Sequence, residues 1–439
     1  MFQLLQTDDK TRARRGRLTT AHGVIETPAF MPVGTQGSVK AVSPRELRQL
    51  EAQVILGNTY HLFVRPGMEV IRQFGGLHRF MSWNAPILTD SGGYQIFSLA
   101  KLRRIIEEGV HFQNHLDGSP AFISPEIAME IQATLGSDIA MVLDECPPWP
   151  CEREYAARSL EMTIRWARRC KAAAQRGTEE NVERRTSNVE GQSSEAALID
   201  DEASTSNQLL LGSERGTEAS VRRSTSNFQR PTSKSINHQP STLNQLLFGI
   251  VQGGTFADLR RESAEALVEI GFDGYAIGGV SVGEPEPEMM NAVENSELYL
   301  PPDKPRYAMG LGTPPQLIEL IGRGVDMFDC VLPTRLARNG TAFTAEGTLN
   351  LKNAEFTLDQ APVEAGCSCP ACREFSRGYI RHLLKAEEIL GLRLITLHNL
   401  HFYLALMRRA RAALEGGAFS EFKTDFLKGY RVERSAPGK

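Results

Sequence analysis

The sequence predicts an α/β protein whose central unit is a (β/α)8 barrel of the TIM type. Short apolar runs rich in β-branched residues recur along the chain, and several of them end in Gly or Asp. Stretches with helical spacing separate most of these runs, and eight such units fit within about 300 residues, the size of a closed barrel. A doubly wound open sheet is the alternative. The eight runs are TPAFMPVGT, QVILGNTY, APILTDSGG, SDIAMVLDE, LLFGIVQGG, DGYAIGGVS, RYAMGLG and VDMFDCVLP.

The helices expected between the runs carry their own start signals. Each opens near a Ser, Thr, Asp or Pro, the residues suited to the first turn of a helix. Strands that alternate with helices are joined by crossover connections, which make neighbouring strands parallel. The clearest helical stretches are SPRELRQLEA, SPEIAMEIQATLG, FADLRRESAEALVEIG and TPPQLIELIGRG.

Composition indicates a globular protein outside the membrane. Of 439 residues, 41% are hydrophobic and 23% are charged, and no apolar run approaches the roughly 20 residues of a membrane span. The N-terminal stretch has no continuous hydrophobic region typical of a secretion signal. Seven cysteines are too few for a disulfide scaffold. We therefore expect a cytoplasmic protein.

A low-complexity insertion interrupts the barrel pattern. Residues 177–244 are rich in Ser, Thr, Asn, Gln and Glu and contain irregular repeats, such as RRTSN and RRSTSN. This composition cannot bury enough apolar surface to fold, so we expect disorder. The expected order is strands 1–4 of the barrel in 1–176, the insertion in 177–244, strands 5–8 in 245–345, and a zinc-binding, helical, basic subdomain in 346–439. From residue 373 onward, 13 Lys and Arg face 7 Asp and Glu.

Polar residues and glycines gather at the ends of the expected strands. In a β/α barrel the active site forms at the C-terminal ends of the strands. Asp329 is the most informative, because FDCV places a carboxylate inside an apolar strand, where an unpaired charge is costly. Carboxylates around one cavity suit displacement at a sugar anomeric carbon, and glycine pairs let a flat base lie against backbone. The strand-end residues are Asp90, Asp144, Gln252, Gly278, Gly279 and Asp329.

Three cysteines in CSCPAC form most of a metal site. Their Cys-x-Cys-x2-Cys spacing is typical of zinc ligands, and a fourth ligand is needed for a tetrahedral site. Three histidines follow, and spacing alone does not choose among them. The cysteines are Cys367, Cys369 and Cys372, and the histidines are His382, His398 and His401.

Several motifs together resemble those of bacterial tRNA-guanine transglycosylases, also called queuine tRNA-ribosyltransferases. The motifs are TDSGGYQIFSL, VLDECPPWP, FGIVQGG, GYAIGGVSVGE, DMFDCVLPTRLARNGTAF and the cysteine cluster. The resemblance runs from the N-terminus to about residue 426 and fails only over the insertion. It implies exchange of guanine at the first anticodon position of certain tRNAs for a 7-deazaguanine, by double displacement through a covalent enzyme–RNA intermediate.

The resemblance also implies roles for single residues. Asp329 matches the nucleophile, and Asp90 matches the proton acceptor and donor. Tyr94 falls where a ring stacks on the base, and Cys146 and Val282 match residues that admit the aminomethyl group of the bacterial queuosine precursor. The residues expected to bind the base are Ser91, Gly92, Gly93, Tyr94, Asp144, Cys146, Gln252, Gly278, Gly279, Val282 and Met309.

RNA contacts, zinc and assembly follow from the same resemblance. Arg335 and Arg338 match positions that contact the uridines beside the target guanine in the anticodon loop. His398 is selected as the fourth ligand, which gives a closed, structural Cys3His zinc site, one per subunit of a homodimer. The residues expected to bind RNA are Gly310, Leu311, Gly312, Thr313, Pro314, Pro315, Gln316, Thr334, Arg335, Leu336, Ala337 and Arg338.

Two other functions fit the sequence less well. A zinc-dependent barrel hydrolase keeps an open metal position at the strand ends, whereas these three thiolates lie beyond the eighth strand. A non-catalytic tRNA-binding paralogue or accessory subunit would lack part of the catalytic set, whereas Asp90 and Asp329 are both present. The enzyme acting on the bacterial base is the preferred interpretation.

Overall fold

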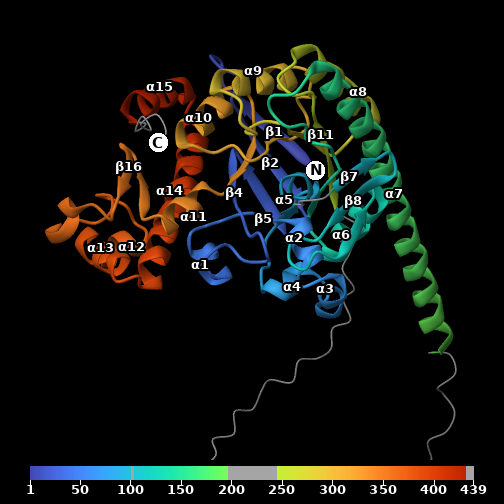
Figure 1. The fold of residues 1–439 in the computed structure, drawn as a ribbon, viewed down its shortest axis with the longest axis horizontal. Coiled ribbons are helices and arrows are strands. Elements are labelled where there is room, and N and C mark those ends of the chain that lie inside the picture. Colours follow the sequence, from blue (N-terminus) through green and yellow to red (C-terminus); the bar gives the residue numbers. More distant parts are fainter. Residues whose placement is uncertain (100–102, 196–244, 432–439) are drawn as a thin grey trace, which may run out of the picture.

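Eight parallel strands form a single sheet that curls into a nearly closed barrel (Figure 1). The architecture is that of a computed structural model, which describes residues 1–99, 103–195 and 245–431. Each of the eight apolar runs contains one of the strands, so the predicted barrel is confirmed. In chain order the strands are β4 (Ala29–Pro32), β5 (Ile55–Gly57), β6 (Ile87–Thr89), β10 (Ile139–Met141), β11 (Leu246–Val251), β12 (Gly274–Ile277), β13 (Arg306–Ala308) and β14 (Met327–Cys330).

The barrel closes between its first and last strands. Each strand from β5 to β14 pairs in parallel with the next in chain order, and β14 pairs with β4 from Met327 to Cys330. The remaining seam, between β4 and β5, is held by a parallel bridge between Val33 and Leu56. The Gly34 N–H donates to the Leu56 carbonyl at 2.7 Å. All eight C-terminal ends therefore meet at one rim.

Helices cover the outside of the barrel, and three of the four expected helical stretches begin at a side-chain cap, whereas the helix that starts at Ala257 follows Phe256 without one. At α6, the Ser124 hydroxyl accepts from the Ile127 N–H, and Pro125 occupies the first turn. At α10, Thr313 and Gln316 form a reciprocal capping box. The barrel helices are α1 (Pro44–Gln49), α2 (Thr59–Val64), α3 (Met68–Phe74), α4 (Leu77–Met81), α5 (Gly93–Leu99), α6 (Pro125–Leu135), α7 (Arg153–Glu195), α8 (Ala257–Ile270), α9 (Glu286–Glu297), α10 (Pro314–Gly322) and α11 (Leu332–Arg338).

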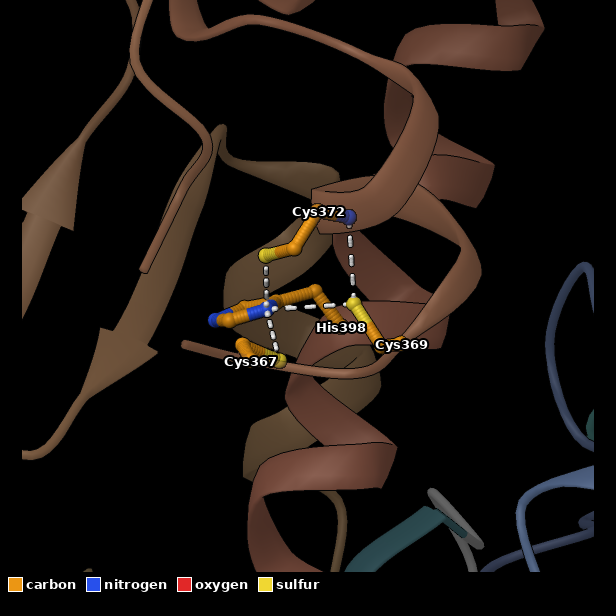
Figure 2. A group of neighbouring side chains, drawn as sticks. All are labelled: Cys367, Cys369, Cys372 and His398. Atoms are coloured by element: carbon orange, nitrogen blue, oxygen red, sulfur yellow. Dashed lines mark hydrogen bonds between the residues drawn. The ribbon is translucent and has the colours of Figure 1, made fainter. Parts of the chain in front are cut away.

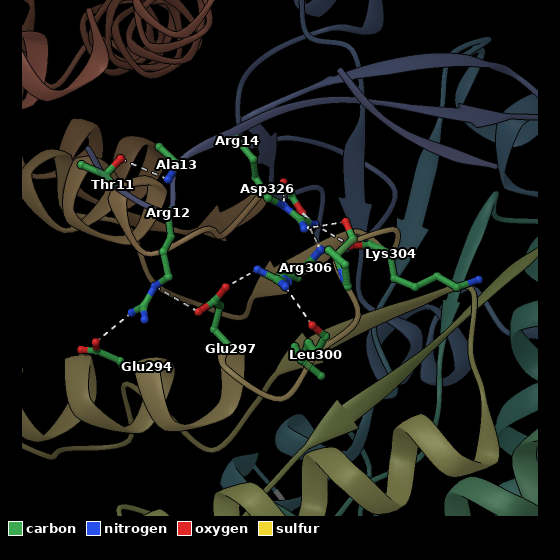
Figure 3. A network of polar contacts seen from close by, with 11 residues as sticks. Thr11, Arg12, Ala13, Arg14, Glu294, Glu297, Leu300, Lys304, Arg306 and Asp326 are labelled. Carbon is green, nitrogen blue, oxygen red and sulfur yellow. Dashed lines mark hydrogen bonds and ion pairs between the residues drawn. The ribbon is translucent and has the colours of Figure 1, made fainter. Parts of the chain in front are cut away.

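A three-stranded antiparallel sheet covers the N-terminal ends of the barrel strands. Arg14 Nε lies 2.9 Å from Oδ1 of Asp326, which directly precedes β14, and both side chains are buried. Asp326 also accepts from the Arg306 N–H at 2.7 Å, and the buried Arg306 guanidinium pairs with Glu297 (Figure 3). The Arg14–Asp326 pair attaches the sheet to the barrel, and the Arg306–Glu297 pair joins a barrel strand to the helix before it. Its strands are β1 (Phe2–Thr7), β2 (Arg14–Thr20) and β3 (Gly23–Thr27).

The C-terminal part forms a smaller unit beside the barrel (Figure 1). Its long helix α14 passes the length test for a membrane span, but 67% of its most apolar window is buried, as in a core helix. The elements of this part are β15 (Thr341–Thr344), β16 (Gly347–Asn350), the 3-10 helix η3 (Ala354–Leu358), α12 (Pro370–Glu374), α13 (Arg377–Lys385), α14 (Ile389–Glu415) and α15 (Phe419–Gly429). A further antiparallel sheet between α5 and α6 comprises β7 (Arg103–Ile106), β8 (Gly109–Gln113) and β9 (Pro120–Ile123).

The insertion lies between α7 and β11. Helix α7 runs past the barrel to Glu195, so its last part extends into the residues assigned to the insertion from sequence (Figure 1). Residues 196–244 lie outside the described residues. At the start of β11, the Leu246 N–H donates to the carbonyl of Asp138, just before β10. The chain therefore re-enters the barrel at the N-terminal face, opposite the strand-end rim.

We predict that a short Gly/Ser linker in place of residues 179–242 leaves the fold intact. The exchange activity implied by the resemblance should stay within a few-fold of wild type, because loop-closure entropy changes only with the logarithm of length. Circular dichroism and an exchange assay measure the two properties, and a linker of twice the length serves as control. A loss of about a hundredfold in a folded variant would contradict placement on the face opposite the active site.

Candidate active site and metal centre

The structure brings four of the expected strand-end side chains into one buried rim. Asp90 follows β6, Asp144 follows β10, Gln252 follows β11, and Asp329 lies in β14. All four side chains are buried. A buried charge is costly without hydrogen-bond partners. The partners of each carboxyl group therefore show which of its oxygens are stabilised by the protein and which are open to a substrate.

Asp90 is held by three donors. Its Oδ2 accepts from Asn58 Nδ2 at 2.5 Å and from Gln95 Nε2 at 2.8 Å, and its Oδ1 accepts from the Thr59 N–H at 2.8 Å. Burial nevertheless raises the pKa of Asp90 to about 6, and the nearby charge of Asp329 adds to the rise. A carboxyl group with this pKa can lose and regain a proton near neutral pH.

Asp329 has one occupied and one free oxygen. Its Oδ1 accepts from the Tyr307 hydroxyl at 2.6 Å and from the Gly310 N–H at 2.7 Å, whereas no described residue donates to Oδ2. Burial raises the pKa of Asp329 above its ordinary value, and the two hydrogen bonds oppose that rise. The bonds fix the carboxylate and leave Oδ2 available for a substrate.

Asp144 forms a polar chain with two neighbours. Its Oδ1 accepts from the Ser91 hydroxyl at 2.8 Å, and its Oδ2 accepts from Gln252 Nε2 at 2.7 Å. The other end of this amide, Gln252 Oε1, is buried and has no hydrogen-bond partner among the described residues. An orphaned buried acceptor of this kind suits a donor supplied by a ligand. Burial is the main reason that the pKa of Asp144 is raised.

Glycines let the backbone approach these polar groups. A Cβ atom on Gly93 would lie 2.6 Å from the Asp144 carbonyl oxygen, and one on Gly279 would lie 2.3 Å from Gln252 Oε1. Gly279 also has a φ of +60°, which favours glycine. A cavity of about 140 Å³ opens here, lined by Pro147–Cys151, Gly254–Phe256, Gly279, Val282 and Glu284. Its walls thus include two of the expected base-binding residues.

The other expected base-binding residues surround this rim. Ser91, Gly92, Gly93 and Gly278 are buried, whereas the Tyr94 side chain is 51% exposed. Cys146 and Met309 are partly buried beside the main core. Burial raises the pKa of Cys146 to about 12, so its thiol stays neutral at physiological pH.

The expected RNA-binding residues follow the last two barrel strands. Gly310–Gln316 connects β13 to α10 and includes its first turn, and Thr334–Arg338 lies in α11, directly after β14. Arg335 and Arg338 are exposed, and neither forms an ion pair with a described carboxylate. Two unpaired guanidinium groups therefore lie on the helix that directly follows the strand of Asp329.

Sequence reasoning missed four side chains of the rim. Asn58 and Thr59 follow β5 in ILGNTYHL, so the strand-end rule that selected the other residues would also have found them. Gln95 lies in the TDSGGYQ motif but was not selected. Tyr307 lies within the buried strand β13, and no local signal distinguishes its hydroxyl from that of a core tyrosine.

The three cysteines of CSCPAC converge on His398 (Figure 2). The distances from His398 Nδ1 to the sulfur atoms of Cys367, Cys369 and Cys372 are 3.8, 3.5 and 3.3 Å. Ligands of one tetrahedral zinc ion would lie about 3.5 Å apart. His398 Nε2 lies 2.6 Å from the Phe343 carbonyl, so it carries the hydrogen and leaves Nδ1 free as a ligand. These four residues can hold a metal ion.

A second histidine cluster does not have this geometry. His22 and His78 each contact a different oxygen of Asp138, at 2.9 and 3.2 Å. The two rings stack at 3.6 Å with an interplanar angle of 18°. Nearly parallel stacked rings direct their nitrogen lone pairs in separate planes, so they do not converge on one ion. The cluster connects the turn between β2 and β3, and helix α4, to the start of β10 by hydrogen bonds.

Comparison with known proteins gives one consistent result. The family model for queuine tRNA-ribosyltransferase matches residues 8–195 and 202–432, and the gap lies inside the low-complexity stretch. A queuine tRNA-ribosyltransferase of Symbiobacterium thermophilum is 49% identical over 427 residues, covering 97% of this chain and 90% of the relative. One of Pelotomaculum thermopropionicum is 49% identical over 430 residues, covering 98% of each. One of Staphylococcus aureus is 47% identical over 436 residues, covering 99% of this chain and 98% of the relative. This chain belongs to the queuine tRNA-ribosyltransferase family of enzymes.

Proposed function

We propose that this enzyme exchanges guanine at the first anticodon position of tRNA for 7-aminomethyl-7-deazaguanine, the bacterial queuosine precursor. The observation that carries the proposal is the rim of buried carboxyl groups, in which Asp329 offers one unpartnered oxygen beside glycine-rich backbone. The printed names of the relatives support the reaction class. Incubation with unmodified tRNA and labelled guanine tests the proposal, because only an exchanging enzyme incorporates the label.

The reaction proceeds by two displacements at the ribose C1′ carbon. Asp329 Oδ2 attacks C1′, a C–O bond forms, and the bond from C1′ to N9 of guanine breaks with its electron pair going to the base. Protonated Asp90 gives its proton to the departing base. The incoming base then loses its N9 proton to Asp90, attacks C1′, and releases the Asp329 carboxylate. Two inversions retain the sugar configuration.

The remaining rim residues recognise the base. Asp144 and the orphaned Gln252 Oε1 accept hydrogen bonds from the N–H groups of the base edge, while the Gly279 N–H donates to its carbonyl oxygen. Tyr94 stacks on the ring. Cys146 and Val282 leave space for the aminomethyl group. The physical requirement is that every buried polar atom acquires a partner when the base enters.

The tRNA anticodon loop binds where Arg335 and Arg338 project. Planar guanidinium groups stack on and hydrogen-bond bases splayed out of a loop. Gly310–Gln316 contributes backbone beside them. The enzyme acts in the cytoplasm, where its tRNA substrate is found, and works as a homodimer.

The Cys3His group holds a structural zinc ion. Four protein ligands saturate tetrahedral zinc and leave no position for a substrate. Cys367, Cys369 and Cys372, the last of them in α12, and His398 in α14 would hold the ion, which would cross-link these two parts of the chain. Because such a site exists only in the folded chain, zinc binding contributes to the stability of the C-terminal unit.

The first prediction concerns the nucleophile. Asp329→Asn should lower exchange by at least about a thousandfold, because an amide cannot form the covalent intermediate. Binding of tRNA should persist. Wild type incubated with tRNA should give a covalent adduct on a denaturing gel, and the variant should give none. Asp303→Asn, at an exposed position, is the charge-matched control. Near-normal exchange by Asp329→Asn would show that Asp329 is not the nucleophile.

The second prediction concerns zinc. Cys369→Ser should reduce bound zinc and lower the thermal midpoint of the C-terminal unit, with activity falling as a consequence. Elemental analysis and thermal unfolding provide the readouts. Cys151→Ser, outside the cluster, is the control and should keep its metal. A wild-type protein without zinc, equally stable with and without chelator, would refute a structural ion.

The third prediction concerns Asp90. The pKa of about 6 in the native state lies above the usual value of 3.8, so the native state retains a proton that the unfolded chain loses. Stability contributed by this proton is complete at low pH and is lost as pH rises through about 6. Asp90→Asn does not ionise. Its free energy of unfolding relative to wild type should increase by about 1 kcal/mol from about pH 5 to about pH 7.5.

Urea unfolding of both proteins at the two pH values measures this change. The exposed Asp303→Asn is again the control and should show no such trend. A difference between wild type and Asp90→Asn that does not change with pH would show that Asp90 has an ordinary pKa.

A further inference from the structure

Arg260 is a buried cation that forms no ion pair with a described carboxylate, and Glu284 acts on it only from beyond ion-pair distance. It lies in the first turns of α8, and its side chain is fully buried. Its guanidinium donates only to backbone carbonyls, and it forms no ion pair with a described residue. Nε donates to Gly254 O at 2.6 Å, Nη1 to Gly278 O at 2.7 Å and Val251 O at 3.2 Å, and Nη2 to Gly279 O at 3.0 Å.

This arrangement is costly without a purpose. A buried charge normally has a counter-ion, because carbonyl dipoles replace only part of its hydration. Burial lowers the pKa of Arg260 to about 10, which still leaves it protonated at neutral pH. By contrast, Arg306, which is also buried but at the other end of the barrel, pairs with Glu297. Of the four arginines that are buried in the described residues, Arg14, Arg15 and Arg306 each pair with a carboxylate and Arg260 does not.

The contacts of Arg260 determine the direction of two peptide groups. In a trans peptide the C=O and the following N–H point in opposite directions. Because the carbonyls of Gly278 and Gly279 point to Arg260, the N–H groups of Gly279 and Val280 point away from it. Gly279 lines the cavity, and no described residue accepts from its N–H. That donor is therefore turned away from α8 and is available to a ligand.

We propose that Arg260 is a positioning residue that aims the Gly279 N–H at the carbonyl oxygen of the base and carries positive charge to it through the intervening peptide. The proposal rests on the proposed function. When the bond from C1′ to the base breaks, the electron pair moves onto the base and part of the charge reaches its carbonyl oxygen. A fixed dipole polarised by a buried cation stabilises this charge without reorganisation.

The test compares Arg260→Lys and Arg260→Gln with Arg306→Lys. Arg260→Lys keeps the charge but loses the planar set of donors, and Arg260→Gln loses both. KM for the base should rise about tenfold in Arg260→Lys and further in Arg260→Gln, since one well-aimed hydrogen bond to a partly charged atom is at stake. The Kd for tRNA should remain within about twofold, because Arg260 does not face the RNA. Arg306→Lys should lower the thermal midpoint and leave KM for the base unchanged.

A second measurement does not depend on how much of each variant is folded. Wild type and variants are assayed with the base and with an analogue that has hydrogen in place of the carbonyl oxygen. Wild type should prefer the normal base by at least about tenfold, and this preference should shrink toward unity in the Arg260 variants.

The outcomes separate the two proposals. Wild type that incorporates no base contradicts the proposed function itself. Wild type that exchanges bases, while Arg260→Lys and Arg260→Gln keep its preference for the carbonyl oxygen, contradicts only the role of Arg260. Equal shifts in the Arg306→Lys control would likewise overturn it, because they would indicate a general effect of losing a buried guanidinium.

Discussion

The burial of three carboxyl groups in one rim is the constraint on which the rest of the active site depends. Closure of the parallel sheet brings Asp90, Asp144 and Asp329 together at the C-terminal strand ends, away from water. Burial raises the pKa of each of them. Their different hydrogen-bond partners then give them different environments. Asp90 accepts hydrogen bonds from three donors. In Asp329, one oxygen accepts from two donors. Each oxygen of Asp144 accepts from one side chain, Ser91 or Gln252.

At the opposite end of the barrel, the buried carboxylates are paired with basic side chains. There, Arg14 pairs with Asp326, and His22 and His78 bind Asp138. The pKa of Asp138 is lowered, because the hydrogen bonds it accepts outweigh its burial. A charge with a full set of partners stabilises the attachment of one element to another, but it is not available to a ligand. Buried charged residues therefore hold elements together at the N-terminal end of the barrel, whereas residues of the same types remain available to a ligand at the strand-end rim.

Helix α14 links the metal centre to the strand-end rim. His398 lies among the three cysteines, and the next residue, Asn399, donates to the carbonyls of Pro333 and Thr341 at 3.0 Å. One turn later, the Tyr403 hydroxyl donates to the Gly312 carbonyl at 2.6 Å. The helix thus holds both α11 and the segment after β13. A metal ion at His398 would fix the helix on which the expected RNA-binding segments depend.

The sequence by itself determined the eight strands, the strand-end acids and the cysteine cluster, because each has a local signal. The signals are short apolar runs for the strands, a carboxylate in or after such a run for the acids, and ligand spacing for the cysteines. It left the fourth metal ligand open among three histidines until the family resemblance selected His398. Tertiary structure decided what has no local signal. Tyr307 reaches Asp329 across neighbouring strands, and Arg260 lies on an ordinary amphipathic helix yet ends beneath Gly279. Such contacts depend on which residues meet after the barrel closes, and sequence spacing does not encode the directions of side chains from different elements.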